Sequence, residues 1–426
     1  MNIYIKKSTT YYRPILYVLK IIEKNKNLKF DFVDVVEDAD LIWDHSIDNT
    51  QIISYNFYNE LHKNKPKLNH EIVFKEQPII LNKKGQRDYI ATIFYMINCL
   101  QEYSLSNKNL DKIGRFRFDS SYQFRFDNIE ENLVQQYIDH LVEIFNIVDV
   151  TNKQSVFFIS HDIDSIYGSF LQDGYWAAKN FRIDVILTII ANELIRKPHW
   201  KNIDKIIKLD NEFDVRSTFF WLVNKGKGST NIENADYNIS KEKVLLDMVK
   251  ESGFVNGLHK SCHDMSINEE LQKGEISNTC NRYHYLKYLP SSDWKKISDS
   301  KIDFDSSVGF SERYGFRNSY GMPFQPYDIK DDKPFNFVEA PLHFMDRTFH
   351  KYMKINTNEI GNIIIEYFER NQLNCLFSLL WHNTYFTDYK YNSFLEEYKK
   401  VMSFIYESKI SSLVPEEIVS DNILKW

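Results

Sequence analysis

The sequence predicts an α/β protein that combines a distorted (β/α) barrel with a smaller N-terminal α/β domain. The length of 426 residues favours two structural units, or one large barrel with a smaller partner. Hydrophobic residues make up 43% of the chain and aromatic residues 15%, which is enough for a sizeable core. From Gln154 onward, short apolar runs alternate with polar loops and helical patterns, which is the element order of a parallel sheet or barrel.

Residues 1–125 have the pattern of a small α/β domain. Apolar residues recur at helical spacing in the segment 88–103, where Ile90, Ile93 and Ile97 would share one helix face. The other elements expected in this domain are a helix over 14–24 and strands over 30–35, 39–43 and 78–81.

A connecting segment over residues 126–153 links the two units. It contains a predicted helix over 130–147, and it follows a polar and aromatic stretch over 104–127 that we expect to form a loop or hairpin. The barrel is then assigned to residues 154–426.

Nearly continuous apolar runs of four to six residues in the barrel segment suit strands that are buried on both faces. The predicted strands are SVFFIS, RSTFFWLV, FVNGLH, KIDFDSS, FNFVEAPLHF and LFSLLWH. Helices are expected between them over 203–209, 241–252 and 359–370. Ser240 is the predicted N-cap of the second of these helices, and Gly253 follows its end.

The charge of the chain argues against nucleic acid as a partner. The formal net charge of -6 is spread without long runs of either sign, so the basic footprint that phosphate backbones require is missing. The four cysteines are scattered without a CxxC pair, which fits a reducing compartment. Lys20 interrupts the apolar run over 14–22, and no apolar stretch approaches the ~20 residues of a membrane span. We therefore expect a cytoplasmic protein without a membrane span.

Two aspartates end the first predicted strand of the barrel, where reactive residues of such folds lie. Asp162 and Asp164 are at i and i+2, so on an extended segment they project from the same face, roughly 7 Å apart. Two such carboxylates would repel each other. A divalent cation bound by one of them lets the other remain ionised as a general base.

Two histidines follow the third predicted strand and are four residues apart. If a helix or turn begins at Leu258, the imidazoles of His259 and His263 lie on one face, the arrangement in which two histidines bind one metal. With Asp164 they would provide three protein ligands and leave one position open, as in catalytic rather than structural sites. This ligand set accepts zinc, cobalt, nickel, manganese or iron.

In this order, the motifs resemble those of the polysaccharide deacetylases of the NodB-homology type, whose shared fold is a distorted (β/α) barrel. The resemblance extends from about Gln154 to the C-terminus. It rests on the DxD of Asp162 and Asp164, STFF from Ser217, the HxxxH of His259 and His263, RYHYLKY from Arg282, and LLWHN around His382. The stretches DFDSSVGFSERYGFRNSYGMPFQPYD and EAPLHFMDRTF are similar to a subgroup with an additional N-terminal α/β domain.

The resemblance implies a metal, usually zinc, held by three ligands: Asp164, His259 and His263. It implies that Asp162 is the base that activates water, that Arg282 orients or balances this carboxylate, and that His382 protonates the leaving amine. The chain departs from the commoner pattern at three places. Lys260 and Cys262 lie inside the second histidine motif, where the common pattern has a hydroxyl residue after the first histidine. Ile163 separates the two aspartates, and RYHY replaces the usual Arg-x-Pro motif.

Other polar residues near these motifs are interpreted as structural. His161 and His284 are expected to be packed or hydrogen-bonded histidines, and Cys262 is expected to be a small packing residue. Asp303 and Asp305 form a second DxD, which we interpret as capping at a strand end.

The leading functional hypothesis is metal-dependent removal of the acetyl group from an N-acetylated sugar or glycan. One alternative is a catalytically inactive glycan-binding or scaffold protein with a vestigial barrel site, whose N-terminal domain recruits a protein partner. Another alternative keeps the metal but acts on a different small amide, such as a ureide or a nucleotide-linked sugar.

Overall fold

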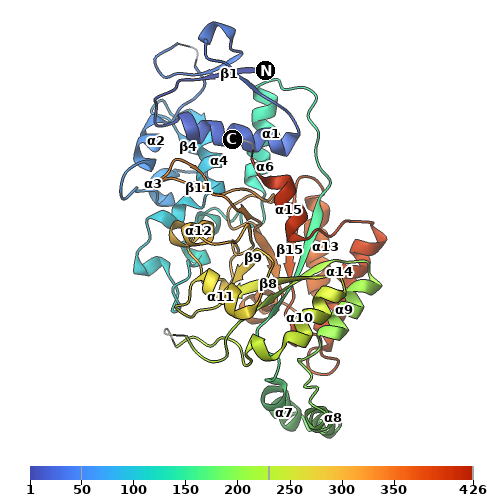
Figure 1. The fold of residues 1–426 in the computed structure, drawn as a ribbon. Coiled ribbons are helices and arrows are strands. Elements are labelled where there is room, and N and C mark those ends of the chain that lie inside the picture. Colours follow the sequence, from blue (N-terminus) through green and yellow to red (C-terminus); the bar gives the residue numbers. More distant parts are fainter. Residues whose placement is uncertain (49, 229–230, 425–426) are drawn as a thin grey trace.

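The structure is a computed structural model that describes residues 1–48, 50–228 and 231–424. Figure 1 shows the barrel in the lower part of the molecule and the N-terminal region above it. Two helices, α7 (Ser169–Lys179) and α8 (Ile183–Leu194), project from the lower end. In the described part of the chain, no helix combines the length and the apolar character needed to cross a membrane.

The barrel is one curled sheet, to which the described residues contribute eight strands in the order β13-β10-β9-β8-β7-β6-β15-β14. Every pairing between neighbours is parallel. The strands are β6 (Val156–Ile163), β7 (Ser217–Trp221), β8 (Val255–Lys260), β9 (Cys280–Tyr283), β10 (Phe304–Asp305), β13 (Val338–Glu339), β14 (Leu342–Met345) and β15 (Leu376–Leu380). The predicted fold class, a distorted (β/α) barrel, is confirmed. Because the strands are parallel, their carboxyl ends meet at one edge.

The apolar runs form these strands because both faces of the sheet are covered. All residues of β7 and β15 are buried. One face carries Phe158, Phe220 and Phe304, which pack with Ile418 of α15 (Pro415–Asn422) in a separate apolar cluster. Side chains alternate along a strand, so Asp162 shares the face of Phe158 on β6. The first aspartate of the DxD therefore points to the same side of the sheet as this cluster.

Helices connect the strands as the sequence predicts, with small differences at their ends. The predicted helices over 203–209, 241–252 and 359–370 correspond to α9 (Ile203–Glu212), α10 (Lys243–Glu251) and α13 (Ile360–Arg370). Helix α10 has Glu242 rather than Ser240 at its N-cap, because Ser240 lies in a short 3-10 turn over Ile239–Lys241. The remaining helices of the barrel are α11 (Ile267–Gly274), α12 (Pro290–Ser298) and α14 (Asn392–Glu407).

The N-terminal region contains a small parallel sheet in the order β2-β1-β3. Its strands are β1 (Asn2–Ile5), β2 (Asp31–Phe32) and β3 (Leu41–Trp43), and β4 (Ile80–Leu81) pairs with β5 (Arg87–Asp88). Its helices are α1 (Tyr12–Lys26), α2 (Tyr55–Leu61), α3 (His70–Val73), α4 (Tyr89–Ile97), α5 (Tyr122–Arg125) and α6 (Leu133–Ile144). The strands expected over 30–35 and 39–43 are present but shorter.

The N-terminal region packs tightly against the barrel. Arg317 donates from Nε and Nη2 to the two carboxylate oxygens of Glu102, at 3.0 and 2.7 Å, and both side chains are buried. Residues of α1, α4 and the segment before β11 (Tyr327–Asp328) belong to one hydrophobic cluster with the barrel. This packing brings side chains of the N-terminal region to the wall of the site described next.

Candidate metal centre and active site

The carboxyl edge of the sheet carries a set of buried polar side chains. Five strands contribute to it at or just after their ends. The residues are Asp162 and Asp164 from β6, His259 from β8, Arg282 from β9 and His284 just after it, Asp346 and Arg347 after β14, and His382 after β15; all are buried except Arg347, which is half-buried. The sequence motifs that were far apart along the chain thus meet at one edge.

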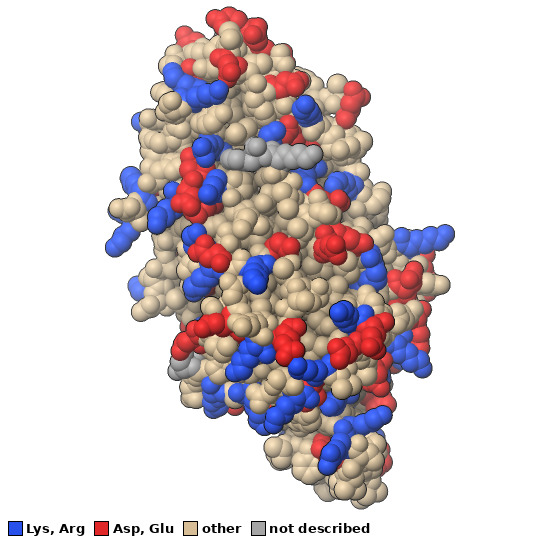
Figure 2. All heavy atoms as spheres, in the orientation of Figure 1, with Lys and Arg blue, Asp and Glu red and all other residues tan. Residues whose placement is uncertain are grey.

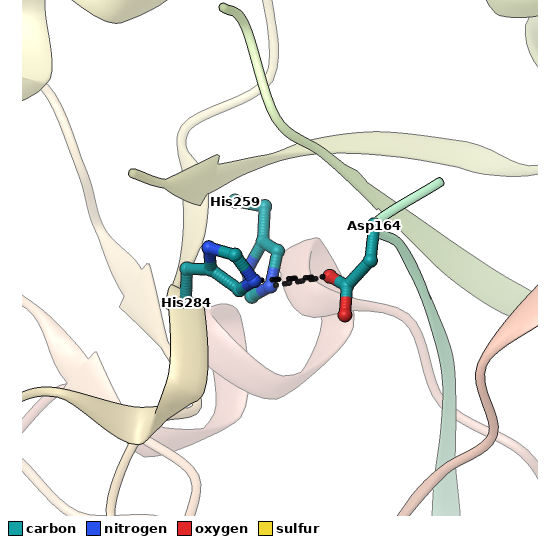
Figure 3. A group of neighbouring side chains, drawn as sticks. All are labelled: Asp164, His259 and His284. Carbon is teal, nitrogen blue, oxygen red and sulfur yellow. Dashed lines mark ion pairs between the residues drawn. The ribbon is translucent and has the colours of Figure 1, made fainter. Parts of the chain in front are cut away.

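Asp164, His259 and His284 form the centre of this set. Their side chains point toward one another, and one ligand atom of each lies within 4.8 Å of the others (Figure 3). Oδ1 of Asp164 is 3.4 Å from Nε2 of His259 and 3.5 Å from Nε2 of His284. All three residues are buried.

The donor atoms of this group fit a divalent metal ion. His259 holds its Nδ1 2.9 Å from the carbonyl oxygen of Arg282, which makes Nδ1 the protonated nitrogen and leaves the lone pair of Nε2 free. Oδ1 of Asp164 is buried and accepts no hydrogen bond from any described residue. Two ligands of a tetrahedral ion at about 2.1 Å lie roughly 3.4 Å apart, close to the spacing seen here. The group can therefore hold a metal, with room for a further ligand on its open side.

His284 reaches the group because the chain turns sharply after β9. The next two residues, Tyr285 and Leu286, have φ of 61° and 51°, a left-handed conformation that is costly for residues with side chains. The rings of His284 and Tyr285 stack with centroids 3.9 Å apart. Arg115 of the N-terminal region donates from Nη1 to the carbonyl oxygen of Tyr285 at 2.9 Å, which stabilises the turn.

The structure does not bring the other expected ligand, His263, to this group. The i, i+4 argument requires a helix or turn from Leu258, but β8 continues through Lys260. His259 therefore lies on the strand, whereas His263 lies in the bend that follows it, so the two imidazoles do not share a helix face. His263 is half-buried in a neighbouring groove, and its carbonyl oxygen accepts from Nζ of Lys260 at 3.3 Å.

Sequence reasoning interpreted His284 as structural because β9 was not recognised as a strand. Its sequence, CNRY, has no apolar run. The signal that could have found His284 is its position, since it follows the end of a strand in the series that also yields His259 and His382.

Asp162 and Arg282 form a buried ion pair next to the group. Nη1 of Arg282 is 3.0 Å from Oδ1 of Asp162 and also donates to Oγ of Ser160 at 2.8 Å. Nε and Nη2 of Arg282 donate to the backbone and hydroxyl oxygens of Ser306. The guanidinium is therefore fixed, and it leaves Oδ2 of Asp162 directed toward His259, at 3.4 Å from its Nε2.

His382 lies on the other side of the group and is oriented by Asp346. Nδ1 of His382 is 2.8 Å from Oδ1 of Asp346, and Nε2 is 3.6 Å from Oδ2 of Asp164. The same Oδ2 is 3.1 Å from Nη1 of Arg347. Sequence reasoning did not assign Asp346 or Arg347, although both follow an apolar run that it predicted to be a strand.

The positive neighbours keep both aspartates ionised. Burial by itself raises the pKa of Asp162, but His259, Arg282 and His382 lower it, and the pKa lies below its ordinary value. Burial likewise opposes ionisation of Asp164, but its neighbours His284 and Arg347 hold the pKa of this carboxyl well below its usual range.

The pKa values of the two histidines of the group are shifted in opposite directions. Burial alone would lower the pKa of His259, but the carboxylates of Asp162 and Asp164 outweigh it and the pKa is raised. For His284, burial outweighs Asp164, and the pKa is lowered. A lowered pKa favours the neutral form of the His284 imidazole, and the neutral form is the one that binds a metal.

A cavity of about 40 Å³ lies over these residues, with Arg115, Arg347 and Lys351 in its wall. By volume it accommodates a few water molecules. It adjoins a groove of about 740 Å³, and Tyr283 and His284 line both. The site thus has a small reactive chamber next to a larger space.

Three of the polar residues that the sequence analysis interpreted as structural have structural partners. His161 is buried, with Nδ1 at 2.8 Å from the carbonyl oxygen of Trp381 and Nε2 at 3.2 Å from Asp210. Asp303 accepts from Thr279 at 2.6 Å, and Asp305 accepts from the backbone N–H of Ser307 at 3.0 Å.

Comparison with known families covers the N-terminal part of the chain. A model described as a family of unknown function (DUF7033) matches residues 1–150. No curated protein matches the chain.

Several solved structures are similar to about two thirds of the chain at low identity. One is a protein provisionally assigned as a polysaccharide deacetylase from Mycobacterium smegmatis, with 12% identity, 63% of this chain and 90% of that chain covered, and a TM-score of 0.40. The PuuE allantoinase has 9% identity, 63% and 89% coverage, and a TM-score of 0.39. A CE4 family pseudoenzyme from Bacillus anthracis has 10% identity, 65% and 72% coverage, and a TM-score of 0.28. Structural similarity at these identities and TM-scores does not support a function for this chain. Any function has to be argued from the residues of the site.

Proposed function

We propose that the protein is a metal-dependent hydrolase that removes the acetyl group from an N-acetylated carbohydrate. The proposed metal ligands are Asp164, His259 and His284. One observation carries the proposal. The buried Oδ1 of Asp164 accepts no hydrogen bond from described residues, and two imidazole Nε2 atoms lie within 3.5 Å of it.

A divalent ion, when bound there, lowers the pKa of a water molecule and polarises an amide carbonyl. The residues of the chain supply the proton transfers. Asp162 is ionised and buried beside the group, so it can accept a proton from the attacking water. Arg282 holds this carboxylate in place through the 3.0 Å ion pair.

His382 is the proposed acid that protonates the departing amine. Asp346 holds the N–H of its Nδ1, so Nε2 is the nitrogen that faces the cavity. A carboxylate partner also stabilises the protonated imidazole. Asp162 and His382 flank the group from different strands, which separates the base from the acid.

The carbohydrate part of the proposal rests on the order of the motifs, which resembles that of polysaccharide deacetylases. The groove beside the cavity supports it by size, since about 740 Å³ is enough for a sugar chain rather than a small amide alone.

The test is release of acetate and appearance of a free amine after loading the protein with zinc or cobalt. The substrates to compare are sugar nucleotides, chitin oligomers and peptidoglycan fragments. We expect activity on at least one class, and we expect His382→Gln to lower it by about 10²- to 10⁴-fold. His140→Gln, at the surface, is the matched control and should leave activity unchanged.

The rival is an inactive binding or scaffold protein. Bound metal without acetate or amine from any of these substrates would favour it. So would metal content below about a tenth of an equivalent that zinc or cobalt does not restore. Hydrolysis of a ureide without action on N-acetylated sugars would support the amide alternative.

A further inference from the structure

The helical hairpin formed by α7 and α8 is an insertion that leaves the barrel directly after the DxD. It occupies the chain between β6 and α9, and it projects from the lower end of the molecule (Figure 1). The two helices pack against each other through a small apolar cluster of their own, made of Ala177, Val185 and Ile189. The hairpin is therefore a defined structural element.

The hairpin carries an unusual share of the exposed apolar surface. Of the 23 exposed large hydrophobic side chains among the described residues, ten lie between residues 167 and 195. Phe181, at the turn between the helices, is 90% exposed. Scattered exposed hydrophobic residues are ordinary, but a concentration of this kind marks a binding surface. In Figure 2 this end of the molecule is mostly tan, whereas blue and red alternate over the barrel above it.

Helix α8 is apolar on two opposite sides. Val185 and Ile189 face α7 and are buried. The exposed side chains recur at i, i+4, i+7 and i+11, which places them on one stripe at about 100° per residue. They are Ile183, Leu187, Ile190 and Leu194. A helix that is apolar on opposite sides is stable when both are covered, and only one is covered here.

The base of the hairpin is firmly fixed. Asp173 of α7 is buried and accepts from Trp200 at 2.9 Å and Tyr389 at 2.7 Å, with Nζ of Lys390 at 3.1 Å. Nδ2 of Asn383 donates to the carbonyl oxygens of Ser165 and Trp200, both at 2.8 Å, which ties the two ends of the insertion together. The exposed stripe is thus presented in a fixed orientation.

The charges around the apolar stripe favour a negatively charged surface. Four basic side chains of the segment 169–197 are exposed, although the whole chain has a net charge of -6. They are Lys179, Arg182, Arg196 and Lys197. Of the three acidic residues in the segment, Asp173 is buried and paired with Lys390, which leaves Asp184 and Glu193.

We propose that the α7–α8 hairpin docks the protein on the surface of an anionic lipid bilayer. Helices of 11 and 12 residues are about 17 Å long and cannot span the hydrocarbon core, but they can lie in the interface with apolar side chains inserted. Aromatic and aliphatic side chains with flanking lysine and arginine suit the boundary between headgroups and acyl chains. This proposal is independent of the chemistry proposed for the metal centre.

Flotation of the full chain with lipid vesicles tests the proposal. We expect binding to vesicles of phosphatidylcholine with phosphatidylglycerol, and weaker binding to phosphatidylcholine alone. The variant Phe181→Ser/Leu187→Ser/Leu194→Ser should bind at least about tenfold less. A second variant, Lys179→Glu/Arg196→Glu/Lys197→Glu, should lose the preference for anionic vesicles.

The matched control changes three exposed hydrophobic residues outside the hairpin: Ile72→Ser/Val148→Ser/Val244→Ser. It should bind vesicles like the parent protein, and circular dichroism should show the parent fold for all variants. Absence of vesicle binding by the parent protein overturns the proposal. A parent dimer that the Phe181/Leu187/Leu194 variant converts to a monomer, without vesicle binding, assigns the stripe to contacts between copies of this chain instead.

Discussion

Two pairs of carboxyl groups are buried in the same sheet, and their surroundings differ. Asp162 and Asp164 lie at the carboxyl edge of β6 among positively charged side chains. Asp305 and Glu339 face each other across β10 and β13. Both pairs are almost fully buried, so burial alone cannot account for the difference between them.

The second pair accepts its hydrogen bonds from neutral donors. The backbone N–H of Ser307 lies 3.0 Å from Oδ1 of Asp305 and 3.1 Å from Oε1 of Glu339. Nδ2 of Asn281 donates to the other oxygen of Asp305 at 2.5 Å. Burial raises the pKa of Asp305 to about 6, and burial together with Asp305 raises the pKa of Glu339 well above its ordinary value. This pair therefore retains a proton.

The comparison shows which buried carboxylates are prepared for chemistry. Positive neighbours lower the pKa of the first pair, so both groups are charged and attract a cation or accept a proton. The second pair binds the backbone after β10 and shapes the sheet. Buried carboxyl groups of one sheet thus have their pKa values shifted in opposite directions because of their neighbours.

The largest expected effect is on turnover. Asp162→Asn removes the proposed base while keeping its size, and we expect activity to fall by about 10²- to 10⁴-fold. Asp305→Asn, the matched change in the other pair, should alter activity less than about threefold. Steady-state kinetics and elemental analysis check this, with metal content unchanged in both variants. Retained activity in Asp162→Asn would contradict the assignment of Asp162 as the base.

The next effect is on the pH dependence of stability. The pKa of Asp305 is 3.8 in its ordinary state and about 6 in the fold. Between these values unfolding releases a proton, so the free energy of unfolding falls as pH rises, by up to about 1.4 kcal/mol per pH unit. Asp305→Asn cannot ionise and should show a shallower fall between pH 4 and 6.

Urea unfolding at several pH values measures this slope. Asp299→Asn, at an exposed position where the carboxylate pairs with Lys295, is the control and should keep the parent slope. An unchanged slope in Asp305→Asn would show that the second pair is ionised like the first.

A smaller effect is expected from the N-terminal region. Arg115 holds the carbonyl oxygen of Tyr285 beside His284, so Arg115→Ala should loosen the turn and weaken metal binding by about tenfold. Arg117→Ala is the control, because Arg117 is partly exposed and pairs locally with Asp119. Metal titration measures both, and equal affinities would mean that the turn holds His284 without Arg115.

The strands of the barrel could be predicted from the sequence wherever they are continuous apolar runs. Strands β7 and β15 lie within predicted runs, and β6 and β8 begin in predicted runs and extend beyond them, because both faces of these strands are buried. Strand β9 could not be recognised, since its buried residues Asn281 and Arg282 are polar. They are satisfied by Asp305 on β10 and by Ser306 just after it. Such pairing depends on the fold and leaves no hydrophobic pattern.

The residues of the site could likewise be predicted where they belong to recognised strands. Asp162, Asp164, His259 and His382 follow recognised strands, and the structure brings them together. His284 depends on the unrecognised strand β9. Arg115 is 170 positions from Tyr285 in the chain, and spacing arguments do not reach across that separation. The hairpin was missed because α8 is apolar on opposite sides and has no single amphipathic face.

The most direct test of the central claim is metal stoichiometry in two histidine variants. Purified protein, His284→Ala and His263→Ala are titrated with zinc or cobalt and followed by calorimetry and elemental analysis. We expect one equivalent in the parent protein and in His263→Ala, and less than about a tenth of an equivalent in His284→Ala at the same free metal concentration. Full binding by His284→Ala together with loss in His263→Ala would contradict the metal centre described here.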